Sequence, residues 1–372
     1  MKILPIPFQS GDRKQWFHPG FSPLQNGRTL LTKQEISGAD YYGEPAFSIS
    51  GCGMENFSVP QKIPAFINRK RQEHLIEGVA DIRPFDLGNG HTAVLGCTTF
   101  YCDKGNAEWE HSAGKTVPQN EPVVCFLRPD GSWSELFYLD VDGLTAGYRT
   151  ACSQITATPD GCWIIPFYAE IPGKTCEIFG CKSVCFCAIT AKYRFDGEKF
   201  VFLEKGNVLE NPVGRGFCEP SVMLSNREEY FLTLRAEDGH GYAAHSSDGL
   251  NWSTPVAWHW SGGSEIEMSS TQQHYVKLGN KIFLVYTRKD EGNQHIFRFR
   301  APLFIAEADP FCGILKRETE QIVFDRQQKN GEEAWFGNFH VTQLSGERAW
   351  IADSALFSKQ KIAMPLLAEI TD

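Results

Sequence analysis

The sequence has no long apolar run, no excess of positive charge and no Cys-x-x-Cys pair. A helix that crosses a membrane needs about 20 consecutive, mostly apolar residues, so no membrane span is predicted. The formal net charge of −9 excludes a general nucleic-acid binder, because such proteins need cationic surfaces to meet the phosphates. The opening stretch MKILPIPFQSGDRKQW lacks the apolar core of a signal peptide, so we expect a cytoplasmic protein.

The chain has 12 cysteines, and four of them lie close together in sequence: Cys176, Cys181, Cys185 and Cys187. Such a density raises the question of a zinc site, which the spacing does not support. Cys185 and Cys187 alternate along a strand-like run, as small buried hydrophobic residues do. We therefore favour reduced structural thiols over disulfides and over zinc. No cofactor is predicted, and a structural or site-bound divalent ion stays open.

Aromatic residues make up 13% of the chain, which also contains 9 Trp and 34 Gly. This composition favours a turn-rich, all-β fold. A chain of 372 residues could hold two domains or one large β domain. As one domain it would bury roughly three quarters of its unfolded surface. We predict a single domain over residues 1–372.

The stretch around residues 214–255 contains four short strand-like segments separated by turn residues. The segments read CEPSVMLS, EYFLTLRA, GYAAHSS and WSTPVAW. Four antiparallel strands joined by short turns form a meander, which on its own leaves an apolar face and two edges bare. The meander therefore needs neighbours of the same kind.

The same pattern recurs along the chain and predicts a six-bladed β-propeller of four-stranded antiparallel blades. The turn glycines at 131, 197, 249 and 313 are 66, 52 and 64 residues apart, and 372 divided by six is 62. The last blade, NFHVTQL, RAWIADSAL and KIAMPLLAEI, is one strand short. We expect the N-terminal MKILPIPF to supply that strand and close the ring. Seven blades stay open if the insert DKGNAEWEHSAGKTVPQN contains further strands.

Blade geometry predicts where polar residues gather. The start of strand one and the turn after strand two lie on one face of the ring, and the turn after strand three lies on the opposite face. Residues at the first two places should therefore converge on one mouth. The starts of the first strands supply His18, Asp81, Glu219, Gln273, His274 and His340. The turns after the second strands supply Arg235, Glu237, Asp238 and Arg288, and Arg13 lies near the same rim.

These residue types are those that an active site for an anionic substrate needs. Carboxylates and imidazoles transfer protons, and guanidinium groups hold an anion. We predict that Glu219, His18 and Asp81 are catalytic. The predicted substrate-binding residues are Arg235, Glu237, Asp238, Gln273, His274, Arg288, His340 and Arg13. In the structural alternative, Arg235 pairs locally with Glu237 or Asp238 and the histidines have structural roles.

The turn from Ser246 through Asp248 and Gly249 to Trp252 is similar to the Asp-box of sialidases, a motif that folds a turn and does no chemistry. With EPSVMLS and LRAEDG before it, this stretch resembles the sialidase-like propellers, which include glycosidases and related polysaccharide lyases. Through its repeats the resemblance extends over nearly the whole chain.

The resemblance implies a mouth that binds an acidic terminal sugar. It also implies that Glu219 is the acidic base and that Arg235 and Arg288 bind the carboxylate. Sialidases use a tyrosine nucleophile near the last blade, where this chain reads GNFHVTQLSGERAWIADSAL without Tyr. The arginine motif that sialidases carry near the N-terminus is replaced by SGDRKQW.

We predict an exo-acting glycoside hydrolase that cleaves a terminal acidic, or acid-linked, sugar from a glycan. One alternative is a lyase acting on a uronate-containing linkage, with a histidine or tyrosine taking the proton alpha to the carboxylate. The other is a non-catalytic sugar-binding propeller, for which aromatic platforms would be expected. The predicted partner is a small oligosaccharide, with no nucleic acid and no membrane, and the oligomeric state stays open.

Overall fold

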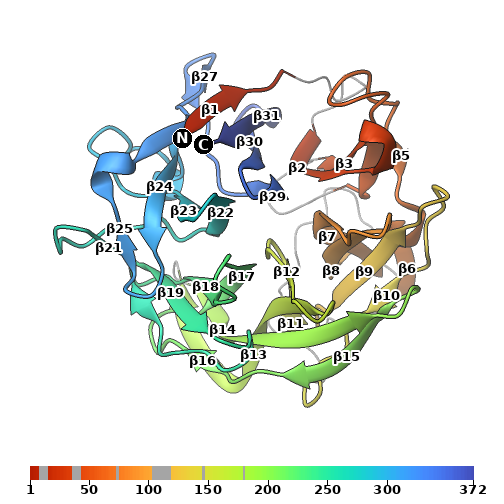
Figure 1. The fold of residues 1–372 in the computed structure, drawn as a ribbon, viewed down its shortest axis with the longest axis horizontal. Coiled ribbons are helices and arrows are strands. Elements are labelled where there is room, and N and C mark those ends of the chain that lie inside the picture. Colours follow the sequence, from red (N-terminus) through yellow and green to blue (C-terminus); the bar gives the residue numbers. More distant parts are fainter. Residues whose placement is uncertain (8–15, 36–42, 73–74, 103–118, 145–146, 179–180) are drawn as a thin grey trace.

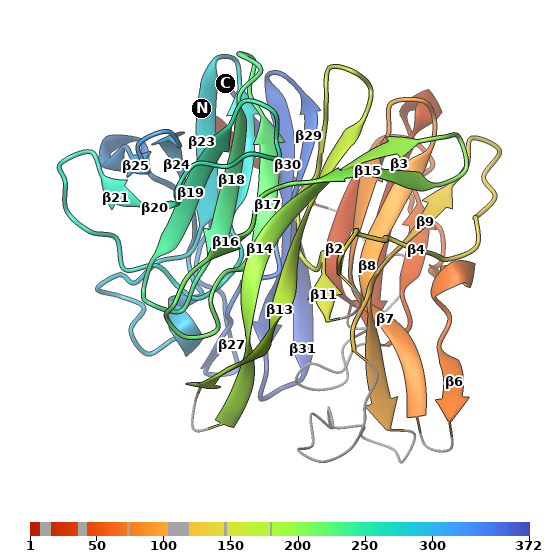
Figure 2. The same cartoon turned by 90° about the horizontal axis from the view of Figure 1, so that it is seen from below.

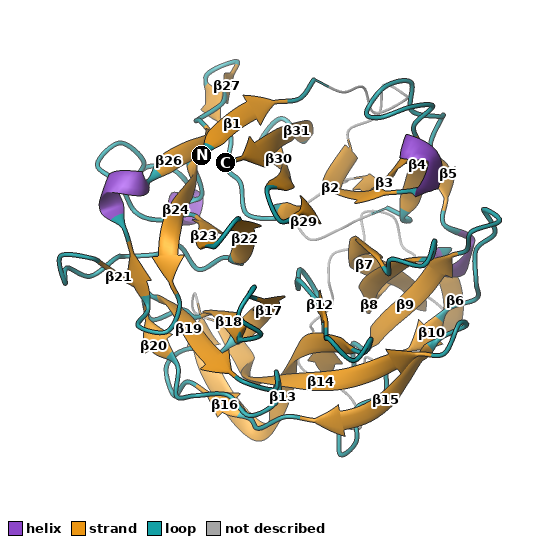
Figure 3. Cartoon of the chain, viewed as in Figure 1, coloured by secondary structure: helices purple, strands orange, loops and turns teal. Residues whose placement is uncertain are grey.

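The strands form a ring of six antiparallel sheets around a common axis (Figure 1). The computed structural model describes residues 1–7, 16–35, 43–72, 75–102, 119–144, 147–178 and 181–372. Strands dominate these residues, and the described helices are four short 3-10 turns (Figure 3). They are η1 (Gln25–Gly27), η2 (Pro64–Phe66), η3 (Phe297–Phe299) and η4 (Arg317–Thr319).

The first three blades follow the predicted repeats. Blade 1 contains β2 (Trp16–Pro23), β3 (Thr29–Glu35), β4 (Ala46–Ile49) and β5 (Gln61–Lys62). Blade 2 contains β7 (Leu75–Asp86), β8 (Thr92–Cys102), β9 (Pro122–Leu127) and β10 (Phe137–Tyr138), with β6 (Arg69–Gln72) beside β7. Blade 3 contains β12 (Thr156–Ala157), β13 (Trp163–Ile178), β14 (Cys181–Phe195) and β15 (Phe200–Lys205), with β11 (Tyr148–Arg149) and β16 (Leu209–Glu210) added.

The last three blades complete the ring. Blade 4 contains β17 (Cys218–Leu224), β18 (Tyr230–Arg235), β19 (Gly241–Ser246) and β20 (Val256–Ala257). Blade 5 contains β22 (His274–Leu278), β23 (Lys281–Tyr286), β24 (Leu303–Asp309) and β25 (Ile314–Leu315), with β21 (His259–Trp260) and β26 (Gln321–Phe324) added. Blade 6 contains β29 (His340–Ser345), β30 (Arg348–Phe357), β31 (Ile362–Thr371) and β1 (Lys2–Pro5). A small hairpin, β27 (Gln328–Lys329) and β28 (Glu332–Glu333), precedes blade 6.

The N-terminal strand closes the ring, as the sequence predicted. β1 pairs antiparallel with β31, with Lys2 opposite Thr371. It thereby covers the edge that a three-stranded last blade would expose. The two chain ends lie next to each other in Figure 1. The prediction of six blades is confirmed; the insert that could have held a seventh lies largely outside the described residues.

Apolar residues fill the spaces between neighbouring blades. The largest such cluster joins blades 5 and 6 through residues that include Val285, Ile305 and Ile351. The cluster between blades 6 and 1 has five buried members: Phe21, Leu31, Trp350, Ala352 and Leu367. Each blade therefore buries its apolar faces only against its neighbours, as expected for a ring of meanders.

One strand predicted from the sequence begins later than expected. The run IFRFRAPLFIAEA suggested a strand from residue 296, but β24 begins at Leu303. Arg298 and Phe299 are consecutive residues with left-handed backbone, with φ of 52° and 56°, which interrupts the regular pairing of a strand. The segment therefore forms the turn η3.

The Asp-box is formed as the sequence predicted. The Asp248 carboxylate accepts hydrogen bonds from the backbone N–H groups of Leu250 (2.8 Å) and Asn251 (2.7 Å). The Trp252 indole N–H donates to Thr190 Oγ1 of blade 3 at 2.8 Å. Burial of the Asp248 carboxyl favours a higher pKa, but these hydrogen bonds outweigh it and hold the pKa below its ordinary value. The box therefore ties the turn of blade 4 to blade 3.

We expect Asp248→Asn to destabilise the protein without slowing its chemistry. The substitution removes the charge that these N–H donors favour, and hydrogen bonds to charged groups contribute about 1.5–3 kcal/mol each. Thermal unfolding should show a clearly lower melting temperature. A variant with the wild-type melting temperature would contradict the structural role of the box.

The two faces of the ring differ in what they carry (Figure 2). The chain ends lie on one face, and the end of β13 and the start of β14 lie on the other, with β6 and β27. We call this second face the connection face, because it carries the links between the second and third strands of the blades. Within the described ranges, no helix has the length and apolarity needed to cross a membrane. The ten cysteines whose side chains the structure describes are all unpaired.

Candidate functional site

The innermost strands of three blades contain a β-bulge at equivalent places. The register shifts between Phe17 and Gly20 in β2, and likewise between Ala80 and Arg83 in β7 and between Cys218 and Ser221 in β17. Within these bulges His18, Asp81 and Glu219 have left-handed backbone, with φ of 53°, 56° and 45°.

Left-handed backbone at a residue other than glycine costs on the order of 1–3 kcal/mol and persists where the surroundings impose it. Bulges re-aim a side chain and are common near active sites. All three predicted catalytic residues therefore have the same unusual left-handed backbone conformation. Cys152, just before β12 of blade 3, also has a left-handed backbone, with φ of 59°.

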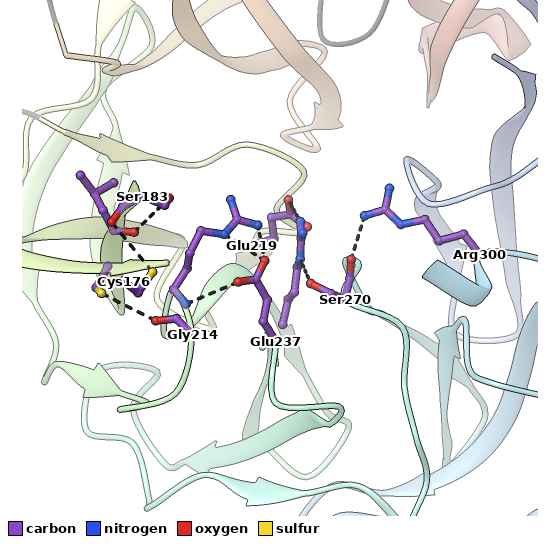
Figure 4. A network of polar contacts seen from close by, with 11 residues as sticks. Cys176, Ser183, Gly214, Glu219, Glu237, Ser270 and Arg300 are labelled. Atoms are coloured by element: carbon purple, nitrogen blue, oxygen red, sulfur yellow. Dashed lines mark hydrogen bonds and ion pairs between the residues drawn. The ribbon is translucent and has the colours of Figure 1, made fainter. Parts of the chain in front are cut away.

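Glu219 forms an ion pair with Arg235, from the end of β18. Arg235 Nε also donates to Ser270 Oγ at 3.2 Å, and the Ser270 carbonyl accepts from Arg300 Nη2 at 2.8 Å. Figure 4 shows Ser270 between Glu219 and Arg300. The pKa of Arg235 is raised, because the charge of Glu219 outweighs the opposing effect of burial. Arg235 therefore pairs with Glu219 rather than with its sequence neighbours.

A second ion pair lies beside the first. Arg215 Nε donates to Glu237 Oε1 at 2.9 Å. Burial favours a higher pKa for Glu237, but the hydrogen bond and charge of Arg215 outweigh it, so the pKa of Glu237 is lowered. Figure 4 shows Glu237 and Glu219 close to each other. Both carboxylates are therefore held by guanidinium groups.

Arg298 adds a third guanidinium group to this region. Its pKa is lowered by burial first, and then by the positive charges of Arg235 and Arg215. The pKa values of Arg215 and Arg235 are raised, because their carboxylate partners outweigh the effect of burial, so Arg298 is the arginine whose charge an added anion would relieve most. We call Arg215, Glu219, Arg235, Glu237 and Arg298 the arginine–glutamate cluster.

Asp81 lies between blade 1 and the arginine–glutamate cluster. Its Oδ1 lies 3.4 Å from His18 Nδ1, and its side chain is 27% exposed. The pKa of the Cys152 thiol is raised by burial and then by the charges of Asp81 and Glu219. Cys152 therefore lies near both predicted catalytic carboxylates, although these come from blades 2 and 4.

The histidines have a different setting from the one predicted. His18, His274 and His340 are buried near Arg83, whose charge lowers the pKa of all three after burial itself. Arg83 Nη2 donates to the Asn338 carbonyl at 3.0 Å. We call His18, Arg83, His274, His340 and Asp353 the channel cluster. His274 and His340 therefore pack inside the ring instead of facing an open mouth.

Acid should destabilise the protein through the channel cluster. The pKa of His274 is lowered to about 3, so its contribution is present above 6.5, the ordinary value, and is lost as the pH falls toward 3. Asp353 acts the other way: burial raises its pKa to about 7, so its contribution is present below 3.8 and is lost as the pH rises through 7. The effect of three histidines opposes that of one carboxyl group, and each group changes the free energy of unfolding by up to about 1.4 kcal/mol per pH unit. The free energy of unfolding should therefore fall from pH 6.5 to about pH 5.

His274→Asn tests this expectation. Asparagine keeps a polar partner for Ser221 Oγ, which lies 2.9 Å from His274 Nδ1, but cannot be protonated. Denaturant unfolding of this variant should show a shallower loss of stability between pH 6.5 and about pH 5. An unchanged slope would show that the buried imidazole does not carry the acid sensitivity.

Three predicted substrate-binding residues have hydrogen-bond partners outside the arginine–glutamate cluster. Gln273 accepts from Trp258 Nε1 at 3.0 Å and is buried within the blades. Arg288 forms two hydrogen bonds with Glu320, from Nε at 2.8 Å and from Nη2 at 2.7 Å. Asp238 accepts from Tyr242 Oη at 2.6 Å and from Asn211 at 2.8 Å, which holds its own turn. Arg13 lies outside the described residues.

Two members of the arginine–glutamate cluster were not among the predicted site residues. Arg215 precedes β17 and has no strand pattern of its own, although GRGFCEP places it close to Glu219 in sequence. Arg298 lies in a segment whose alternation suggested a strand. A tyrosine is also nearby: the pKa of Tyr168 is raised well above its ordinary value by burial, with a contribution from the charge of Glu219. The phenol comes from blade 3, whereas sialidases place theirs near the last blade.

Comparison with solved structures gives matches over the whole chain. A protein of unknown function from Dyadobacter fermentans is 12% identical with a TM-score of 0.65, covering 100% of this chain and 99% of that one. Trypanosoma rangeli sialidase in complex with sialic acid is 14% identical with a TM-score of 0.58, covering 99% and 57%. The NanB sialidase from Streptococcus pneumoniae is 12% identical with a TM-score of 0.60, covering 99% and 70%.

The chain has the sialidase propeller fold. It spans a little over half the length of the trypanosomal sialidase, at 57%. No family model and no curated protein matches the sequence. At such low identity the sialidase fold establishes the architecture, and the chemistry depends on the residues described above.

Proposed function

We propose that this protein is an exo-acting glycosidase that removes a terminal acidic sugar from a glycan by hydrolysis. The observation that carries the proposal is the arginine–glutamate cluster, in which Arg215, Arg235 and Arg298 surround two carboxylates beside the bulged strands. The sialidase fold supports it, because the solved Trypanosoma rangeli sialidase is in complex with sialic acid.

In this proposal the guanidinium groups bind the sugar carboxylate. Arg298 is the best placed to gain an anion, because its charge is opposed by Arg235 and Arg215. Glu219 takes a proton from the attacking water molecule, and Asp81, whose side chain is partly exposed, donates a proton to the leaving oxygen. His18 holds Asp81 from the buried side rather than meeting substrate.

The lyase alternative has less support from this geometry. A lyase needs an imidazole or phenol that reaches the carbon next to the carboxylate. His18, His274 and His340 are buried in the channel cluster, and burial raises the pKa of Tyr168, which keeps the phenol protonated near neutral pH and leaves it unable to accept a proton. Hydrolysis therefore remains the proposal.

A screen of small oligosaccharides tests the proposal directly. The panel should carry a terminal sialate, uronate or rhamnose, with released sugars identified by mass. We expect one acid-capped member to lose its terminal sugar as the free acid. An unsaturated product absorbing in the ultraviolet would favour the lyase, and no release from any acid-capped member would overturn the proposal.

A further inference from the structure

A cavity of about 580 Å³ lies on the connection face, beside the arginine–glutamate cluster but lined by none of its residues. It is bounded by the β27–β28 hairpin, the segment before η3 and the turn between β30 and β31. The lining includes His295, Phe297, Glu332, Glu333, Trp335 and Lys359. This volume is within the range of small-ligand pockets, roughly 300–1,000 Å³.

Two aromatic rings form the apolar part of this cavity. The ring centroids of Phe297 and Trp335 lie 5.5 Å apart at 55°. Phe297 is 53% exposed, which is unusual for a large apolar ring. The Arg300 guanidinium lies 5.9 Å from the Phe297 ring and 5.6 Å from the Trp335 ring, which fixes both.

The two carboxylates of the cavity already have hydrogen-bond partners within the protein. His295 Nε2 lies 2.5 Å from Glu333 Oε2. Glu332 accepts from the backbone N–H groups of Lys359 (2.9 Å) and Gln360 (3.2 Å). A charged ligand would have to displace these partners, whereas hydroxyl groups can share them. The cavity therefore favours an uncharged ligand with both an apolar face and many hydroxyls.

A pyranose sugar has this chemistry, because its C–H groups form one flat face and its hydroxyls surround the ring. We propose that this cavity binds an uncharged pyranose unit on Phe297 and Trp335, with Glu333 and His295 as hydrogen-bonding partners. Arg298 lies 5.0 Å from the Phe297 ring and belongs to the arginine–glutamate cluster, so the cavity adjoins that site. The assignment of this cavity as the subsite for the sugars that follow the acidic terminal sugar rests on the proposed function.

Calorimetric titration with lactose and cellobiose tests the sugar binding by itself. We expect saturable binding of at least one of them, and at least a tenfold weaker affinity in Phe297→Ala and in Trp335→Ala. Phe311→Ala is the matched control, because this aromatic residue of blade 5 is also 43% exposed and contacts Phe231 at 4.8 Å. Its affinity should equal that of the wild type.

The result separates the two proposals. If the protein binds lactose or cellobiose but releases no acidic sugar, the cavity assignment stands and the proposed function fails. If it releases an acidic sugar but binds neither disaccharide, only the cavity assignment fails. Absence of saturable binding to both disaccharides overturns it, and so does wild-type affinity in Phe297→Ala. Because the Phe297 side chain is exposed, Phe297→Ala should fold, and it therefore tests the assignment even where Trp335→Ala does not fold.

Discussion

Glu219→Gln should reduce turnover by about 10²–10⁴-fold on any substrate that the protein cleaves. The amide keeps the size of the side chain and an oxygen to accept from Arg235, but loses the basicity that activates the nucleophile. Initial rates at saturating substrate are the measurement. The ion pair with a buried arginine is also lost, so the melting temperature should fall as well.

Glu237→Gln is the matched control for that second effect. It breaks the neighbouring ion pair, with Arg215, without touching the proposed base. We expect a lower melting temperature and a higher KM, with kcat within about tenfold of the wild type. Equal losses of kcat in the two variants would contradict the base assignment, and near-wild-type turnover of Glu219→Gln would make Glu219 structural.

Arg298→Met should weaken binding of an acidic sugar by about 10–100-fold while the fold keeps or gains stability. The affinity should fall because a hydrogen bond to a charged group contributes about 1.5–3 kcal/mol. The stability should not fall, because burial and the charges of Arg235 and Arg215 disfavour the Arg298 cation in the free protein and outweigh the opposing charges of Glu237 and Glu219. Such a trade between stability and function is common at binding sites.

Calorimetry and thermal unfolding of the same samples measure both effects. Arg348→Met is the control, because that arginine pairs with Glu369 in blade 6, away from the arginine–glutamate cluster. Its affinity for the sugar should match the wild type. A lower melting temperature for Arg298→Met with unchanged affinity would show that Arg298 serves the fold instead of the ligand.

The architecture could be predicted from the sequence because it depends on repetition. Strand patterns and turn glycines recur along the chain, one turn is similar to an Asp-box, and an incomplete last blade requires a closing strand. β1 supplies that strand. The N-terminal residues MKILPIPF were short, apolar and unassigned, which left few other roles for them.

The site was harder to predict because it depends on side-chain direction. Neighbouring strand residues point to opposite sides, so Gln273 and His274 could not both face the channel. His274 meets Ser221, while Gln273 meets Trp258. The burial of the histidines depends on Arg83 packing among them, which periodicity does not reveal.

The left-handed bulges are a further feature that sequence reasoning missed. Nothing in the residue types of His18, Asp81 and Glu219 signals a positive φ, because a bulge is a property of strand pairing. Arg298 was likewise hidden by a run that alternates like a strand and folds as a turn. The predicted register nevertheless selected Glu219 and Asp81, which lie at the bulges of the innermost strands β17 and β7.

The central claim is that the arginine–glutamate cluster recognises the carboxylate of a sugar. Calorimetric titration of sialic acid, glucuronic acid and glucuronamide tests it most directly, because the amide differs from glucuronic acid essentially in charge. We predict that at least one acid binds at least tenfold more tightly than the amide and that Arg298→Met removes this advantage. Equal affinity for acids and amide in the wild type, or an advantage that survives in Arg298→Met, would contradict the account.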